Sequence, residues 1–347
     1  MVRSSIRNSP NFSLQSGEIP PISLEMTPLS ESFSWLRVSS DEIFKILTAA
    51  LASAIIVIIA LSAWVLVQGS FPVFQRFGLS FLTGVRWDPV AGHEVFGALP
   101  YLLGTIVTSA IAIIVGVPVS LGIAIFLSEM APSRIKAIVS SMVELLAAVP
   151  SVIYGLWGLF VFRFWVSDLI EKPLVTYFGQ IPVFQGTPFG LDILTAGLIL
   201  AIMIIPTVSS ISKEVMMAVP DAQREAAYSI GATRWETVRM AVLNYSRSGI
   251  FGATILGLGR AVGETIAVTM VIGNAIGPGA VPTSLLKPGQ TMASLIANEF
   301  NEADPTSLHT PALIGVGLIL FMLAATINIL AQVLVWKVLK VKGGAVE

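Results

Sequence analysis

The stretch GIFGATILGLGRAVGETIAVTMVIGNA, residues 249–275, is long and apolar enough to cross a membrane, yet it carries Arg260 and Glu264. A transmembrane helix needs about 20 consecutive, mostly apolar residues. An arginine at the centre of such a helix costs roughly 2.5–3.5 kcal/mol to insert, so a charged side chain there normally faces protein or water. The stretch therefore predicts a membrane helix with a polar face inside a bundle of helices.

The composition of the whole chain predicts the same class of protein. Of its 347 residues, 54% are hydrophobic and 12% are charged, and the mean hydropathy is +0.83. Soluble domains average about 25% charged residues, so we expect an all-α polytopic membrane protein. The net charge of −1 does not favour nucleic-acid binding. With no cysteine and only His93 and His309, the sequence gives no indication of a disulfide, a metal site or a catalytic residue.

Six stretches have the length and composition of a membrane span, and Pro150 and Pro206 inside two of them predict kinks. The predicted spans are residues 46–67, 101–126, 135–162, 191–211, 249–275 and 311–336. Residues 1–40 are rich in Ser and Pro and predict a disordered tail, followed by a first transmembrane helix at 41–69 and an external loop at 70–97. The segments 68–97, 163–190 and 277–309 are too long for simple turns, so we expect short interfacial helices or gates there.

The distribution of positive charge predicts which side of the membrane each loop occupies. Fourteen of the twenty Lys and Arg residues lie in the two tails and in the loops after the second and fourth spans. Five lie in the opposite loops, and the remaining one is Arg260. Loops on the cytoplasmic side carry the excess of Lys and Arg, so both termini are predicted to be cytoplasmic.

The cytoplasmic loop after the fourth span is long and has a helical pattern. Residues 212–248 read SKEVMMAVPDAQREAAYSIGATRWETVRMAVLNYSRS. We expect Asp221 to cap a first short helix that Gly231 ends. Thr233 should cap a second helix, with Glu236 three residues later completing a capping box. The loop is thus predicted to be two short helices that are too polar to insert in the membrane.

Such a loop is either a solvated connection or a docking element for a cytoplasmic partner. The residues Glu225, Ala226, Ala227 and Gly231, followed by an element around Leu243, resemble the EAA motif of ABC importer permeases. The resemblance implies that the short helix docks on a separate ATP-binding subunit. It is incomplete, since Ala241 and Asn244 stand where the family usually has Ile and Pro. The chain has no Gly-rich loop ending in Gly-Lys-Ser/Thr, so ATP and Mg²⁺ are expected to be bound by that partner, with no cofactor in this chain.

Arg260 lies nine residues after Phe251, which is about 14 Å along a helix and therefore near mid-membrane. Glu264, four residues further on, would share its helix face, so the two could form an intrahelical salt bridge that only stabilises the bundle. Alternatively, Arg260 lines a substrate pathway and binds a tetrahedral oxyanion, with Glu264 positioning it or repelling the anion. Glu144, in the third predicted span, is a further acid whose place along the pathway the sequence leaves open.

Three blocks together carry a more specific resemblance. They are AAVPSVIYGLWGLFVF at 147–162, REAAYSIGATRWETVRMAVL at 224–243, and GLGRAVGETIAVTMVIGN at 257–274. From about residue 70 to 340 the chain resembles the PstC family, permease subunits of the bacterial high-affinity phosphate ABC importer. The resemblance implies a six-span type I importer permease (MetI-like) fold, with a permease domain at 98–340, in the bacterial inner membrane. It also implies that phosphate passes Arg260 and Glu264.

The same resemblance implies a set of partners. These are a second, PstA-like permease, two PstB-like ATP-binding subunits and a PstS-like phosphate-binding protein that meets the external loops. Two other functions stay open at this point. A permease for sulfate or molybdate would use the same arginine, because a guanidinium alone does not distinguish tetrahedral anions. A secondary transporter acting alone would need no docking loop at 212–248 and would be expected to show inverted repeats.

Overall fold

A computed structural model describes residues 40–90 and 92–338 of the chain. The disordered tail predicted for residues 1–40 lies outside the described residues, except for Ser40, which begins the first helix. The contacts divide the chain into two units, Met1–Ile58 and Ile59–Glu347, and helix α1 (Ser40–Phe77) continues from one into the other. In the first unit, residues 41–58 form a helix with exposed side chains throughout. The remaining description concerns the second unit.

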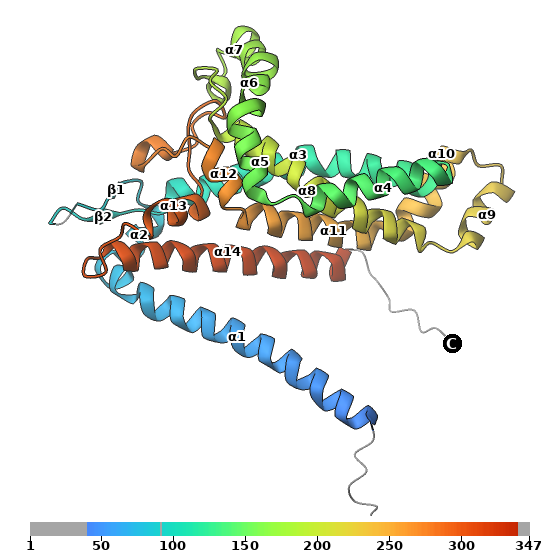
Figure 1. The fold of residues 1–347 in the computed structure, drawn as a ribbon, viewed down its shortest axis with the longest axis horizontal. Helices are drawn as coiled ribbons and strands as arrows, with labels where there is room; N and C mark the ends of the chain where they lie inside the picture. Colours follow the sequence, from blue (N-terminus) through green and yellow to red (C-terminus); the bar gives the residue numbers. More distant parts are fainter. Residues whose placement is uncertain (1–39, 91, 339–347) are drawn as a thin grey trace, which may run out of the picture. The chain divides into compact units, whose positions relative to one another are not determined.

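Four long helices lie side by side in the second unit (Figure 1): α3 (Leu99–Ile125), α8 (Ile193–Met217), α11 (Asn244–Gly263) and α14 (His309–Val338). Helix α8 is the central one, and Ile199, Leu200 and Ile204 on it are buried. Glycines let its neighbours approach closely. A Cβ at Gly257 would lie 2.6 Å from Val208 Cγ2, which is far inside van der Waals contact.

Five helices of the described part are long and apolar enough to cross a membrane: Asp41–Phe77, Leu99–Met130, Ser151–Phe178, Ile193–Met217 and His309–Trp336. Four of the predicted spans fall within these helices. The first of them continues to Phe77, so the loop predicted to begin at residue 70 begins later. The other two predicted spans, 135–162 and 249–275, are each interrupted, and a count of six continuous membrane helices is not confirmed.

The first interruption is at Pro150, between α4 (Ser133–Ala148) and α5 (Ser151–Trp157). Proline lacks the N–H that a helix needs and pushes the preceding residue out of the helical conformation. Val149 accordingly has φ −65° and ψ 126°. Pro206 lies in the interior of α8 without ending that helix. Neighbouring helices pack on both sides of α8 and stabilise it there.

The second interruption is at Glu264, between α11 and α12 (Ile266–Val271). Glu264 has φ −69° and ψ 125°, which is an extended conformation. The two interrupted paths meet, because α12 packs against α5. A Cβ at Gly155 of α5 would lie 3.1 Å from the Cα of Ala267 in α12, so the glycine is needed for this contact.

Beyond α5 the helix continues crosswise to the four-helix bundle (Figure 1). It consists of η3 (Gly158–Phe162), α6 (Arg163–Val166), η4 (Ser167–Glu171) and α7 (Lys172–Phe178). A buried carboxylate fastens it to α8: Glu171 accepts from the Gly190 N–H at 3.0 Å and from the Thr195 hydroxyl at 3.3 Å. Large apolar side chains are exposed on it, among them Leu169 and Tyr177.

Short elements gather at one end of the bundle, opposite α9 and α10 (Figure 1). They are α2 (Ser80–Thr83), the hairpin of β1 (Trp87–Asp88) and β2 (Val95–Phe96), η7 (Gly277–Ala280) and α13 (Met292–Glu299). A further short helix, η5 (Pro182–Phe184), lies in the loop between α7 and α8. Trp87, Phe96 and Tyr101 pack edge to face within this end, with ring centroids 4.9 and 5.4 Å apart. Short helices were expected in these segments; the two-stranded hairpin was not.

Candidate functional site

Arg260 lies one turn before the end of α11, next to the point where the two interrupted helices meet. Its Nη1 donates to the hydroxyl of Thr207 on α8 at 3.3 Å. The guanidinium also interacts electrostatically with Tyr154 of α5. Within residues 40–90 and 92–338 it forms no ion pair. A cation half-buried among three helices thus keeps most of its N–H donors available.

Glu264 has a different position from the one expected of a salt-bridge partner. Because α11 ends at Gly263, the four-residue spacing no longer places Glu264 on the same helix face as Arg260. Its Oε1 instead accepts from the backbone N–H of Ala267 at 3.3 Å, near the start of α12. Carboxylates are favourable at helix N-termini, where N–H groups lack partners. The intrahelical salt bridge is therefore wrong for this structure.

Tyr154 connects the two helices that Pro150 separates. It is buried, and its hydroxyl donates to the carbonyl oxygen of Leu146 at 2.8 Å. This bond links α5 to the end of α4. Glu144, the acid whose place the sequence left open, is exposed on α4 and forms no ion pair with Arg260 in the described chain.

The glycines of α11 divide into two groups. Gly257 packs tightly against Val208, as described above, and Gly249 packs against Val215. Gly259 and Gly263 have no neighbouring atom within 4 Å of an added Cβ. Together with exposed Leu256 they form an open face of α11 next to Arg260.

The loop at 212–248 contains the two predicted helices at the far end of the bundle (Figure 1): α9 (Asp221–Ser229) and α10 (Arg234–Thr237). Gly231 has φ +84°, a left-handed conformation that favours glycine. The capping box is confirmed, since the Thr233 side chain accepts from the Glu236 N–H and Glu236 returns a bond to the Thr233 N–H. A π-helical segment, η6 (Val238–Leu243), then leads into α11.

One detail of α9 differs from expectation. Asp221 does not cap the helix, because Pro220 is the capping residue and the Asp221 carboxylate accepts from Arg224 at 3.2 Å. Of the three residues of the motif, Glu225 and Ala226 are exposed while Ala227 is buried. The outer face of α9 is thus formed by Glu225 and Ala226, with Ile230 exposed beyond the helix end.

Arg224 connects this loop to the bundle. It binds both carboxylate oxygens of Glu129, in the π-helical segment η2 (Phe126–Met130) that follows α3. It also donates to the carbonyl oxygens of Met216 at 3.0 Å and Val219 at 2.5 Å, at the end of α8. The Glu129 carboxylate raises the pKa of Arg224 above its usual value. One side chain therefore joins α9 to the ends of both α3 and α8.

Known proteins similar to this chain identify the family. The family model described as "Binding-protein-dependent transport system inner membrane component" matches residues 116–340. The phosphate transport system permease protein PstC of Haemophilus influenzae is 44% identical over 307 residues, 87% of this chain and 95% of that protein. PstC of Pasteurella multocida is 45% identical over 282 residues, 80% of this chain and 86% of that protein. The chain belongs to the PstC family of phosphate transport system permeases.

As a PstC-family chain, it is an integral inner-membrane permease subunit of an ABC transporter and not an enzyme. It is also similar to a chain of the MetNI methionine ABC transporter in inward-facing conformations. That similarity has a TM-score of 0.46 and 17% sequence identity, and it covers 69% of this chain and 93% of the other.

Sequence reasoning missed three residues that the structure places next to the candidate site residues: Thr207, Tyr154 and Glu129. Thr207 and Tyr154 are polar side chains in apolar helices, which more often bond to their own backbone. Glu129 precedes the third predicted span, and nothing in the local sequence marks it as a partner of the cytoplasmic loop. Its proximity to Arg224, 95 positions along the chain, depends on how α3 and α8 pack. A local sequence pattern cannot predict such a contact.

Proposed function

We propose that this chain is the transmembrane subunit of an ATP-driven phosphate importer and forms half of the pathway for inorganic phosphate. The observation that carries the proposal is Arg260, a half-buried cation inside the bundle with no carboxylate partner in the described chain. The curated relatives are named phosphate transport permeases, which supports phosphate as the anion. The sites proposed for phosphate passage are Arg260 and Glu264.

The chemistry of Arg260 suits this role. A guanidinium stays protonated at physiological pH and directs several N–H donors in one plane, which match the oxygens of phosphate. Thr207 holds one of these donors and sets the orientation of the group. Glu264 lies at the start of α12, where its negative charge is positioned to repel an anion and so to favour release. A pathway needs such weak binding, because tight binding would prevent passage.

The open face of α11 supports a pathway made of two halves. Leu256, Gly259 and Gly263 lie on this face, and the two glycines have no neighbour within 4 Å of an added Cβ. Small residues let helix backbones approach closely in membranes. We therefore place a second, PstA-like permease against this face, with the anion passing between the two chains.

The energy for transport is proposed to come from two PstB-like subunits that bind ATP and Mg²⁺. The exposed Glu225 and Ala226 of α9 are the proposed docking surface, with Ala227 packing inward and Gly231 setting the turn into α10. Arg224 and Glu129 would transmit a displacement of α9 to α3 and α8. A PstS-like protein would deliver phosphate on the opposite side. This arrangement places both termini in the cytoplasm and keeps 98–340 as the permease domain.

The test is phosphate uptake by cells that carry Arg260→Gln. We expect uptake to be abolished while the variant still co-purifies with the other subunits. Arg247→Gln, at an exposed arginine on the same helix, is the matched control and should transport normally. Parental uptake by Arg260→Gln would overturn the pathway role. Inhibition of labelled phosphate uptake by excess sulfate or molybdate would indicate a broader oxyanion permease.

A further inference from the structure

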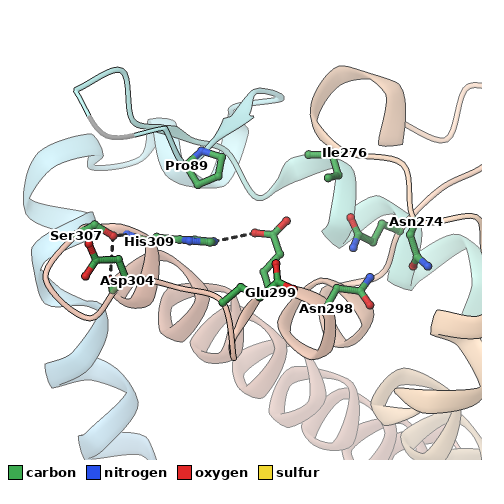
Figure 2. A pocket seen from close by; sticks show the side chains of 10 residues that line it. Pro89, Asn274, Ile276, Asn298, Glu299, Asp304, Ser307 and His309 are labelled. Atoms are coloured by element: carbon green, nitrogen blue, oxygen red, sulfur yellow. Dashed lines mark hydrogen bonds and ion pairs between the residues drawn. The ribbon is translucent and has the colours of Figure 1, made fainter.

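A recess opens at the end of the bundle that carries the hairpin and α13 (Figure 2). Its volume is about 570 Å³. It is lined from three parts of the chain that are far apart in sequence: the hairpin, the segment after α12, and the segment from α13 to the start of α14. The lining residues are Pro89, Asn274, Ile276, Gln290, Asn298, Glu299, Glu302, Asp304, Ser307 and His309.

The charge of this recess is negative. Glu299, Glu302 and Asp304 line it, and no Lys or Arg does. The N–H and hydroxyl of Thr306 lower the pKa of Asp304, so that its carboxylate stays ionised. Free phosphate, also negative, is repelled from such a site. The recess therefore does not continue the path that leads to Arg260.

Glu299 is held in a defined orientation. Its Oε2 accepts from Trp87 Nε1 at 2.8 Å and lies 2.8 Å from His309 Nε2, as the dashed line to His309 shows in Figure 2. Both contacts use one carboxylate oxygen, which leaves Oε1 without a partner in the described chain. The side chain of Glu302 likewise forms no hydrogen bond or ion pair with the residues described. Two carboxylates thus have free acceptor positions at the recess.

Two amides add acceptors that have no partner. Gln290 is 1% exposed, and its Oε1 accepts no hydrogen bond within the described chain. Asn274 donates from Nδ2 to the Thr269 carbonyl oxygen at 2.7 Å, which fixes the amide so that its Oδ1 is the unsatisfied atom. Leaving a buried acceptor unsatisfied is energetically unfavourable. A built recess that retains two of them is suited to a ligand that supplies N–H donors.

We propose that the recess receives a lysine or arginine side chain from the protein that docks on this face and delivers phosphate; this inference rests on the proposed function. Both side chains combine a positive charge with several N–H donors. The carboxylates and amide oxygens of the recess are acceptors without such a partner in the described chain. The volume accommodates a long side chain. The acidic recess then repels free phosphate and binds the protein that delivers phosphate.

The test measures the affinity of the purified phosphate-binding protein encoded with this chain for the assembled transporter in lipid nanodiscs. Glu302→Gln removes one charge from an exposed side chain, so folding should be preserved. We expect it to weaken binding about 5- to 20-fold and to lower the salt dependence. Gln290→Met replaces the buried amide by an apolar group of similar length and should weaken binding too. The control is Asp168→Asn, an exposed acid on η4 outside the recess, which should bind like the parent.

Charge reversal identifies the partner group. Glu302→Lys should nearly abolish binding, and one Lys→Glu or Arg→Glu change in the binding protein should restore it. Parental affinity for both Glu302 variants would overturn the proposal, as would a loss that no reversal in the partner rescues. These outcomes are separate from the proposed function. If Arg260→Gln blocks uptake while the recess variants bind normally, only the docking inference fails, and normal uptake with Arg260→Gln would refute the phosphate pathway itself.

Discussion

Arg224 and Glu129 form a two-armed ion pair, with Nη2 2.9 Å from Oε1 and Nε 3.3 Å from Oε2. The side chains are only 17% and 11% exposed. Arg234, at the start of α10, donates to the backbone oxygen of Glu129. Both short helices of the loop are therefore fastened to the same residue at the end of α3, so a force on α9 reaches the bundle through this pair.

Replacing Glu129 by Ala should loosen the loop and uncouple ATP hydrolysis from transport. The change leaves Arg224 poorly solvated and without its main partner, at a cost of about 2–3 kcal/mol for a pair that is only partly buried. We expect a lower thermal midpoint for the purified complex and more ATP hydrolysed per phosphate moved. Arg224→Lys keeps the charge but not the two-armed geometry, so it should show an intermediate effect. Unchanged coupling in Glu129→Ala would mean that α9 transmits its motion by another route.

The effect of replacing Gly231 should follow the energetic cost of holding each new residue in the left-handed conformation that Gly231 adopts. Its φ is +84°, and no atom lies within 4 Å of an added Cβ, so the effect acts through the backbone alone. That conformation costs most residues roughly 1–2 kcal/mol, and asparagine less than alanine. Coupling efficiency should fall in the order Gly, Asn, Ala, Val. Parental coupling in all three variants would show that the turn between α9 and α10 is not needed for docking.

The capping box at Thr233 should weaken in acid. The N–H and hydroxyl of Thr233, each 2.8 Å from Glu236 Oε2, lower the pKa of that carboxyl. Because the folded-state pKa is depressed, the stabilisation is complete above the unfolded value of about 4.3 and is lost as the pH falls through the lower, folded value. Hydrogen exchange at the start of α10 should therefore speed up, beyond its intrinsic pH trend, only in acid. Glu236→Gln should remove this dependence, and its persistence in that variant would assign it to another group.

How much the sequence predicted depends on the range of the interaction involved. The capping box and the turn at Gly231 were predicted because residues within four positions of each other determine them. The end of α11 at Glu264 was not, because the stretch 249–275 is mostly apolar over the length of a full membrane span and no proline marks the interruption. What holds α12 apart from α11 is its packing against α5, through the close contact at Gly155.

The same distinction applies to the site. Arg260 stood out in the sequence because a charge in an apolar stretch is costly wherever the helix packs. Its surroundings did not, since Thr207 and Tyr154 come from other helices and reach Arg260 only through the tertiary fold. The salt bridge considered as one alternative for Arg260 and Glu264 is absent for the same reason, because it required α11 to continue unbroken through both residues.

A pair of glycines on α11 should separate internal packing from assembly. Gly257→Ala places a Cβ 2.6 Å from Val208 Cγ2 and should destabilise this chain by about 1–3 kcal/mol, as overpacked cores do. Gly259 has open space around it, so Gly259→Ala should fold normally. Gly259→Leu should also fold normally, but it should reduce co-purification with the second permease. Full assembly and uptake in Gly259→Leu would show that the partner permease does not cover this face of α11.

Two substitutions at Glu264 separate its charge from its hydrogen bond. Glutamine retains an oxygen that accepts from the Ala267 N–H, whereas alanine removes the acceptor from the start of α12. If the charge acts on the travelling anion, Glu264→Gln should change the phosphate transport rate several-fold while the thermal midpoint stays at the parental value. Glu264→Ala should change the rate and also lower the midpoint, because an N–H at the helix start loses its partner, at about 1 kcal/mol. A parental transport rate in Glu264→Gln together with a loss in Glu264→Ala would make Glu264 a residue that only positions α12, and phosphate passage would then depend on Arg260 alone.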